Sequence, residues 1–107
     1  MKQRAEPLPD HEASASLTAL ARAFVGLKSA DEVARFLDDL CTPAELEALV
    51  DRWRVVPLLQ QGVPYREIHE RTGVSVTTVG RVARTLDRGA GGYAIAARRA
   101  SRSNESH

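Results

Sequence analysis

The sequence predicts an all-α fold, and three observations support that prediction. Apolar residues recur at intervals of three and four along most of the chain, as they do on one face of a helix. No segment shows the alternation of apolar and polar residues that marks a half-buried strand. Helix start and stop signals divide the chain into segments of ordinary helical length. We therefore expect one helical domain at 13–96, preceded by a flexible arm at 1–12 and followed by a flexible basic tail at 97–107.

Two amphipathic segments form the first part of this domain. Leucine and phenylalanine residues between Leu17 and Leu27 repeat at helical spacing and predict a helix from about Ala13 to Lys28. A second helix should begin after Ser29, because Ser29 followed by Glu32 is a capping-box pattern. The apolar face of the second helix is Val33, Phe36, Leu37 and Leu40.

The strongest helix-start signal in the chain comes next. Thr42 can cap the helix, and Glu45 completes a capping box. Pro43 occupies the first helical position, where the backbone N–H that proline lacks would have no hydrogen-bond partner within the helix. The helix should end at Gly62, a residue that readily adopts the left-handed conformation of helix termini. Pro57 predicts a kink, because proline inside a helix costs about 3 kcal/mol. The predicted apolar stripe of this helix is Leu46, Leu49, Val50, Trp53 and Val56.

The stretch from Tyr65 to Leu86 has the pattern of a helix-turn-helix. Its apolar residues fit two short helices joined by a tight turn at Gly73, with Ser75 as N-cap of the second helix. The shared core should be formed by Ile68, Val74, Val79 and Val82. The opposite side carries hydroxyl and guanidinium groups suited to base edges and phosphates, namely Ser75, Thr77, Thr78 and Arg81. An ordinary αα-hairpin with the same glycine is the alternative.

Glycines between Gly89 and Gly92 should end the motif, and residues 93–97 can begin a last helix.

Charge is distributed unevenly between the two halves of the chain. Residues 1–51 hold five Lys/Arg against ten Asp/Glu, whereas residues 52–107 hold ten Arg against four acidic residues. A basic half that contains a helix-turn-helix fits an anionic polymer as partner. A solvated charged surface is the alternative interpretation.

Composition excludes several other classes of protein. The single cysteine, Cys41, cannot form an intramolecular disulfide, and it fits a reducing cytoplasm. No apolar run approaches the length of about 20 residues that a membrane span needs. The histidines at 11, 69 and 107 lack metal-binding spacing, and no residues suggest catalysis. We therefore expect a cytoplasmic protein that is not an enzyme, with no metal, no cofactor and no membrane association.

The segment LCTPAELEALVDRWRVVPLLQQGVPYREIHERTGVSVTTVGRVARTL resembles the Trp repressor family. Shared features are the Leu-x-Thr-Pro start, an arginine-containing long helix and a reading head that ends in Thr-x-x-Arg, and the resemblance covers roughly Phe36 to Tyr93. It is especially close to a Trp-repressor-like branch with Asp-Arg-Trp and Gly-Gly-Tyr, here at 51–53 and 91–93. The resemblance implies an intertwined helical homodimer whose N-terminal helices wrap the partner. It also implies a sequence-specific repressor that binds an operator in double-stranded DNA.

The same resemblance selects candidate DNA contacts in the reading head. They are Arg66, His69, Ser75, Val76, Thr77, Thr78, Gly80 and Arg84. His69 occupies a position that most such motifs fill with a small residue, where the two helices cross. If its side chain points outward it becomes a phosphate or base contact, and the alternative is an ordinary surface histidine that contacts no DNA.

The resemblance also implies a pocket for L-tryptophan as corepressor. Arg52 and Arg81 match two arginines that sandwich the indole, and guanidinium planes do stack on aromatic faces. Thr85 matches a hydroxyl near the polar end of the ligand. Val82 stands where the tryptophan-responsive repressor has glycine, and its larger side chain could narrow the pocket. The ligand's ammonium would bind carbonyls around Asp39, Cys41 and Thr42. The alternatives are a regulator with another ligand or none, and a helical protein–protein interaction module.

Overall fold

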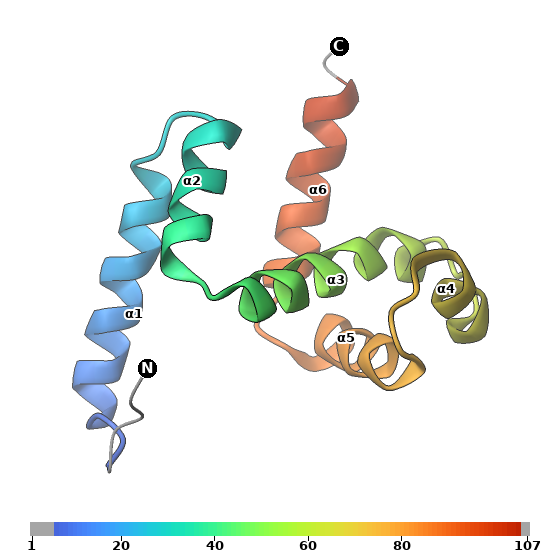
Figure 1. The fold of residues 1–107 in the computed structure, drawn as a ribbon, viewed down its shortest axis with the longest axis horizontal. Helices are drawn as coiled ribbons and strands as arrows, with labels where there is room; N and C mark the ends of the chain where they lie inside the picture. Colours follow the sequence, from blue (N-terminus) through green and yellow to red (C-terminus); the bar gives the residue numbers. More distant parts are fainter. Residues whose placement is uncertain (1–5, 106–107) are drawn as a thin grey trace. The chain divides into compact units, whose positions relative to one another are not determined.

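A computed structural model of the chain describes residues 6–105. In that range it contains α1 (Asp10–Val25), α2 (Ala30–Leu40), α3 (Pro43–Gln60), α4 (Tyr65–Thr72), α5 (Val76–Arg88) and α6 (Gly92–Glu105), as Figure 1 shows. Residues 6–105 include no strand, and the all-α prediction is confirmed. The chain divides into two compact units, with the boundary between Cys41 and Thr42. None of the described helices is long and apolar enough to span a membrane.

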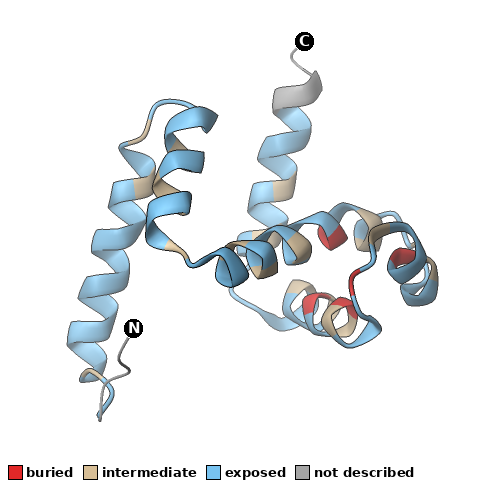
Figure 2. Ribbon diagram, viewed as in Figure 1, coloured by how far each residue is buried: buried red, intermediate tan, exposed pale blue. Residues whose placement is uncertain are grey.

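The first unit contains the hairpin of α1 and α2. Ser29 caps α2 as predicted, since its hydroxyl accepts a hydrogen bond from the Glu32 amide at 3.1 Å. The Glu32 carboxylate accepts from the Lys28 amide at 2.8 Å, one residue earlier than in a standard capping box. The rings of Phe24 and Phe36 meet edge to face with their centroids 5.2 Å apart. Neither helix contains a buried residue (Figure 2).

The bounds of α1 correct the predicted ones. The helix begins at Asp10 and ends at Val25, so residues 10–12 are helical although they were assigned to the flexible arm. The physical reason is that the Pro9 carbonyl accepts the first helical hydrogen bond, from the Ala13 amide at 2.9 Å. Acidic side chains at 10 and 12 also favour the positive end of the helix dipole. Residues 1–5 of the predicted arm lie outside the described residues.

The second unit begins with α3, whose two ends confirm the predicted signals. The Thr42 hydroxyl accepts from the Glu45 amide at 3.2 Å, and the Glu45 carboxylate accepts from the Thr42 amide at 2.8 Å. This second hydrogen bond, to the charged form, lowers the pKa of Glu45. At the other end Gly62 has φ +79°, and the Val63 amide donates to the Leu58 carbonyl at 3.0 Å. The helix continues through Pro57, and the kink there stays a prediction.

The core lies where α3, α4 and α5 meet (Figure 2). It contains Val55 and Val56 from α3. The other four members are the residues predicted from the helix-turn-helix pattern, namely Ile68, Val74, Val79 and Val82. Of the predicted stripe on α3, Val56 is buried in this core, but Leu49 and Val50 are exposed and Trp53 is 39% exposed. The apolar residues of α3 lie on two sides of the helix, and only the side with Val55 and Val56 is buried.

The last helix, α6, packs on α3 and extends further than the sequence suggests. Tyr93 and Ala97 are half-buried against the core. The predicted flexible tail from residue 97 is instead helical as far as Glu105. Alanine-rich sequence between Tyr93 and Ala100 favours helix, and the two packed residues anchor its first turns. Residues 106 and 107 lie outside the described part of the chain.

Candidate nucleic-acid interface

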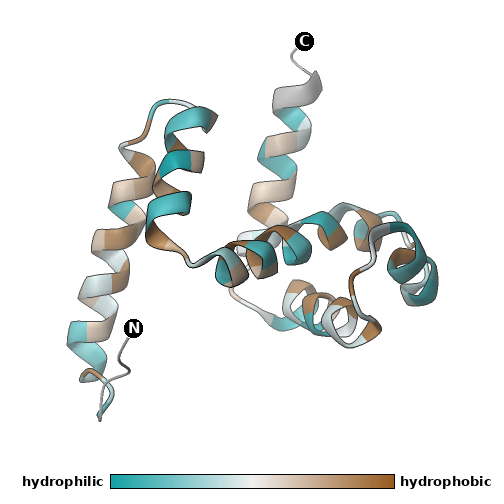
Figure 3. Cartoon of the chain, in the orientation of Figure 1, coloured by the Kyte–Doolittle hydropathy of each residue, from teal (hydrophilic) through white to brown (hydrophobic). Residues whose placement is uncertain are grey.

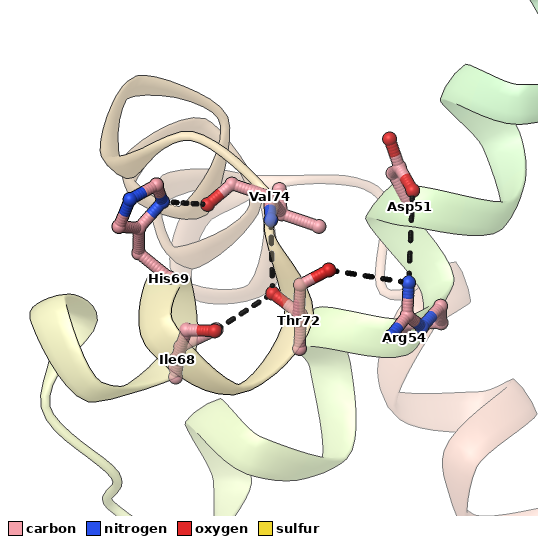
Figure 4. A network of polar contacts seen from close by, with 6 residues as sticks. All are labelled: Asp51, Arg54, Ile68, His69, Thr72 and Val74. Carbon is pink, nitrogen blue, oxygen red and sulfur yellow. Dashed lines mark hydrogen bonds and ion pairs between the residues drawn. The ribbon is translucent and has the colours of Figure 1, made fainter.

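The turn between α4 and α5 is held by hydrogen bonds from both sides. Gly73 adopts φ +78°, and its amide donates to the His69 carbonyl at 2.8 Å. The Thr72 hydroxyl donates to the Ile68 carbonyl at 2.7 Å and accepts from the Val74 amide at 3.1 Å (Figure 4). This one hydroxyl therefore joins the last turn of α4 to the residue that leads into α5.

The long helix α3 also supports this turn. The Arg54 guanidinium donates to the Thr72 carbonyl at 3.4 Å and lies 4.0 Å from the Asp51 carboxylate (Figure 4). Arg54 thus satisfies a carbonyl at the end of α4, where no intrahelical donor exists. Because three helices contribute to the turn, the angle between α4 and α5 is set by the unit as a whole.

His69 has a structural role that the sequence interpretation did not include. Its Nδ1 lies 2.8 Å from the Val74 carbonyl oxygen (Figure 4). A carbonyl can only accept, so we assign the ring proton to Nδ1. The imidazole consequently spans the turn, and its Nε2 is the only ring nitrogen left for another partner.

The start of α5 is defined by Ser75, whose predicted role as N-cap is confirmed. Its hydroxyl accepts from the Thr78 amide at 3.1 Å and donates to the Thr78 hydroxyl at 3.0 Å. The single hydroxyl proton of Ser75 is therefore used inside the cap. Thr77 differs, because it is exposed and its hydroxyl has no hydrogen-bond partner in the described structure. Of the three hydroxyl residues, Thr77 is the most available to an outside group.

The exposed side of α5 forms a hollow of about 940 Å³ with the start of α4. It brings together five of the predicted DNA or ligand contacts, namely Val76, Thr77, Gly80, Arg81 and Arg84. Tyr65, Ala83, Asp87 and Arg88 also line it, and none of them was among the site residues predicted from the sequence. The signal for Tyr65 was an aromatic residue at the first position of the motif with a glycine in the facing helix. Pattern analysis alone does not show that these two residues meet.

Three arginines of α4 and α5 form no ion pair in the described structure, and two of them, Arg81 and Arg84, line this hollow. Arg66, Arg81 and Arg84 are exposed and form no ion pair within residues 6–105. By contrast, Arg71 lies 2.9 Å from the Glu67 carboxylate, and Arg88 lies 3.5 Å from that of Asp87. The three unpaired guanidinium groups keep all their donors available for phosphate oxygens or base edges.

The residues predicted to hold tryptophan are divided between the two units. Asp39 and Cys41 belong to the first unit, whereas Thr42, Arg52, Arg81 and Thr85 belong to the second. Arg52 and Arg81 are both exposed, and Val82 is 1% exposed and forms part of the core. Thr85 lines a separate hollow of about 300 Å³ with Leu86 and residues 90–94.

A metal site requires a cluster of ligating side chains. Within the described residues no cluster of three or more His, Cys, Asp or Glu side chains is placed to hold an ion. His107, one of the three histidines in the sequence, lies outside the described range.

Comparison with known proteins finds a family, a curated relative and solved structures that are similar to this chain. The sequence model of the Trp repressor protein family matches residues 15–101. The uncharacterised protein YerC of Bacillus subtilis (strain 168) is 39% identical over 80 residues, which are 75% of this chain and 77% of YerC. A TrpR like protein from Eubacterium eligens ATCC 27750 has a crystal structure with TM-score 0.74 and 35% identity, covering 80% of this chain and 89% of that one. A candidate Trp repressor from Staphylococcus aureus gives TM-score 0.76 and 32% identity, with coverage of 88% and 96%.

Proposed function

Since the chain belongs to the Trp repressor family, we propose that it is a transcriptional regulator that binds duplex DNA through α4 and α5. The observation that carries this proposal is the helix-turn-helix with its unpaired basic side chains. Arg81 and Arg84 line the exposed face of α5, where Thr77 is also free, and Arg66 is exposed on α4. A helix with this surface can enter a major groove, where hydroxyl and guanidinium groups meet base edges and phosphates.

The proposed contacts divide into two kinds. Arginines at 66 and 84 would bind phosphates, which position the protein without reading sequence. Thr77 and Thr78 would read base edges, and Ser75, His69 and the turn would hold the two helices at the required angle. Because the Thr78 hydroxyl accepts from Ser75, its proton and one lone pair remain for a base, whereas Thr77 retains its full capacity.

We also propose that the regulator acts as a homodimer. The helices of the first unit contain no buried residue, yet they carry large apolar side chains that include Leu17 at 67% exposure. Figure 3 shows these apolar positions along α1 and α2. Exposed Leu49, Val50 and Trp53 on α3 add to the apolar surface. A second copy that covers these faces would supply the missing core, and sedimentation should then give twice the chain mass at micromolar concentration.

Salt-dependent DNA binding tests the main proposal. An operator would first be selected from a random duplex library, and affinity would then be measured between about 50 and 200 mM salt. The slope of log K against log salt is negative, and Arg84→Ala should make it shallower by about 0.9, the value for one lost phosphate contact. Arg35→Ala is the matched control, because it removes the same charge from an exposed ion pair with Asp31 on α2. Equal slopes for wild type and Arg84→Ala would contradict the proposal, as would failure to select any duplex.

For the ligand, we propose L-tryptophan held between Arg52 and Arg81 as corepressor. Support comes from two exposed guanidinium groups without ion pairs in the described structure, which are suited to stacking on an indole. Val82 beside Arg81 fills the core, so little of its side chain is left to narrow a pocket at the surface. The ligand can act only through better contacts with the DNA-binding arrangement of the dimer than with others.

Operator titrations with and without L-tryptophan test this assignment. Wild type should bind the operator more tightly with tryptophan, and Arg81→Ala should lose the response. Arg84→Ala serves as control, because it should bind DNA more weakly but keep the same ratio of affinities with and without ligand. If tryptophan leaves the operator affinity of wild type unchanged, the protein is a regulator that needs no ligand or one that binds another ligand.

A further inference from the structure

We propose that a small apolar slot on the exposed face of α5 receives the 5-methyl group of a pyrimidine in the major groove. The slot is formed by the ring of Tyr65, the main chain at Gly80 and the side chains of Val76 and Ala83. This inference rests on the proposed DNA-binding function and adds a specific base contact to it.

Tyr65 creates one wall of the slot. It is the first residue of α4, and its ring lies against α5, with Cε2 3.9 Å from the position that a Cβ at Gly80 would occupy. Tyr65 lines both the 940 Å³ hollow and a second hollow of about 560 Å³ that includes Leu59 and Val63, as do Ala83 and Asp87. Tyr65 remains 44% exposed, so a ligand can reach its ring.

The identity of residue 80 supports a functional reason for the slot. Gly80 lies inside α5, and it is not among the glycines with positive φ. A methyl group at that position would meet only the Tyr65 ring, at an ordinary van der Waals distance of 3.9 Å. Neither backbone conformation nor packing therefore requires glycine, although glycine disfavours a helix interior. What glycine does provide is open space on the exposed face of α5.

The chemistry of the slot matches one feature of the major groove. Val76 is 47% exposed at the first position of α5, and the Tyr65 ring and Ala83 add further carbon surface. The rest of the hollow is polar, lined by Thr77, Arg81 and Arg84 and by Asp87, whose carboxylate is paired with Arg88. Among the groups that base pairs present in the major groove, the pyrimidine 5-methyl is the apolar one. Thymine carries it in ordinary DNA, and 5-methylcytosine carries the same group.

Base analogues in the selected operator test the inference. Replacing a single thymine with uracil removes only one methyl group, so at one position of a half-site wild type should bind about fourfold more weakly, the effect of one buried carbon. Gly80→Ala should bind the thymine and uracil operators equally. Tyr65→Phe keeps the ring and should keep the discrimination, whereas Tyr65→Ala should lose it. Cytosine and 5-methylcytosine at the same position separate the two sources of the methyl group.

The outcomes separate this inference from the function on which it rests. If wild type selects no operator, the proposed function fails and the slot has no ligand. If it selects one, but no thymine-to-uracil change weakens binding, the slot does not read a methyl group. Discrimination that persists in Gly80→Ala, with circular dichroism showing a folded variant, would also overturn the inference.

Discussion

Substituting glycine with alanine should have opposite effects on stability at two positions of the reading head. Gly73 ends α4 with φ +78° and ψ −4°, a conformation that costs an L-residue roughly 1–2 kcal/mol. A Cβ at this position would meet no atom within 4 Å, so backbone conformation alone sets the cost. Gly73→Ala should therefore lower the free energy of unfolding by about 1–2 kcal/mol.

Gly80 lies in helical conformation inside α5, where alanine is favoured over glycine by about 0.5–1 kcal/mol. The new methyl group would contact the Tyr65 ring at 3.9 Å without displacing it. Gly80→Ala should therefore raise the free energy of unfolding by about that amount, while it changes DNA reading as proposed above.

Urea unfolding followed by circular dichroism measures both effects. Protein concentration must be the same throughout, because the stability of a dimer depends on it. Gly73→Asn is the matched control, since asparagine tolerates the left-handed region better than alanine and should lose less stability. The reasoning is refuted if Gly73→Ala is as stable as wild type, or if asparagine is no better than alanine. Destabilisation by Gly80→Ala would show that the Tyr65 ring cannot accept the added methyl group.

Further predictions concern the start of α3 and the core. Thr42→Ala should cost about 1 kcal/mol, because it removes the hydroxyl that caps the Glu45 amide. The lowered pKa of Glu45 stabilises the fold above the ordinary glutamate pKa of about 4.3, and this contribution is lost as pH falls through the lowered value. Glu45→Gln should therefore lose less stability than wild type between about pH 6 and pH 3, and parallel pH profiles would contradict this. Val79→Ala should cost about 2 kcal/mol in urea unfolding, whereas exposed Val76→Ala should change stability by less than about 0.5 kcal/mol.

Much of the secondary structure could be predicted because its signals act over three or four residues. The Thr42 capping box, the Ser75 cap and the left-handed glycines at 62 and 73 all lie where the sequence indicates. A cap joins a side chain to an amide two or three positions away, so neighbouring residues suffice to specify it. The helix-turn-helix core was predictable for the same reason, since Ile68 and Val79 lie on short helices with a single apolar face.

Features that join distant parts of the chain required the tertiary structure. Apolar residues lie on two sides of α3, and only contact with α4 and α5 decides that Val55 and Val56 are buried while Trp53 stays exposed. The same holds for Tyr65, which lies over Gly80 because α4 and α5 cross there. Local sequence determines where each helix begins and ends, whereas the choice of buried face depends on apolar area supplied by residues far away in the chain.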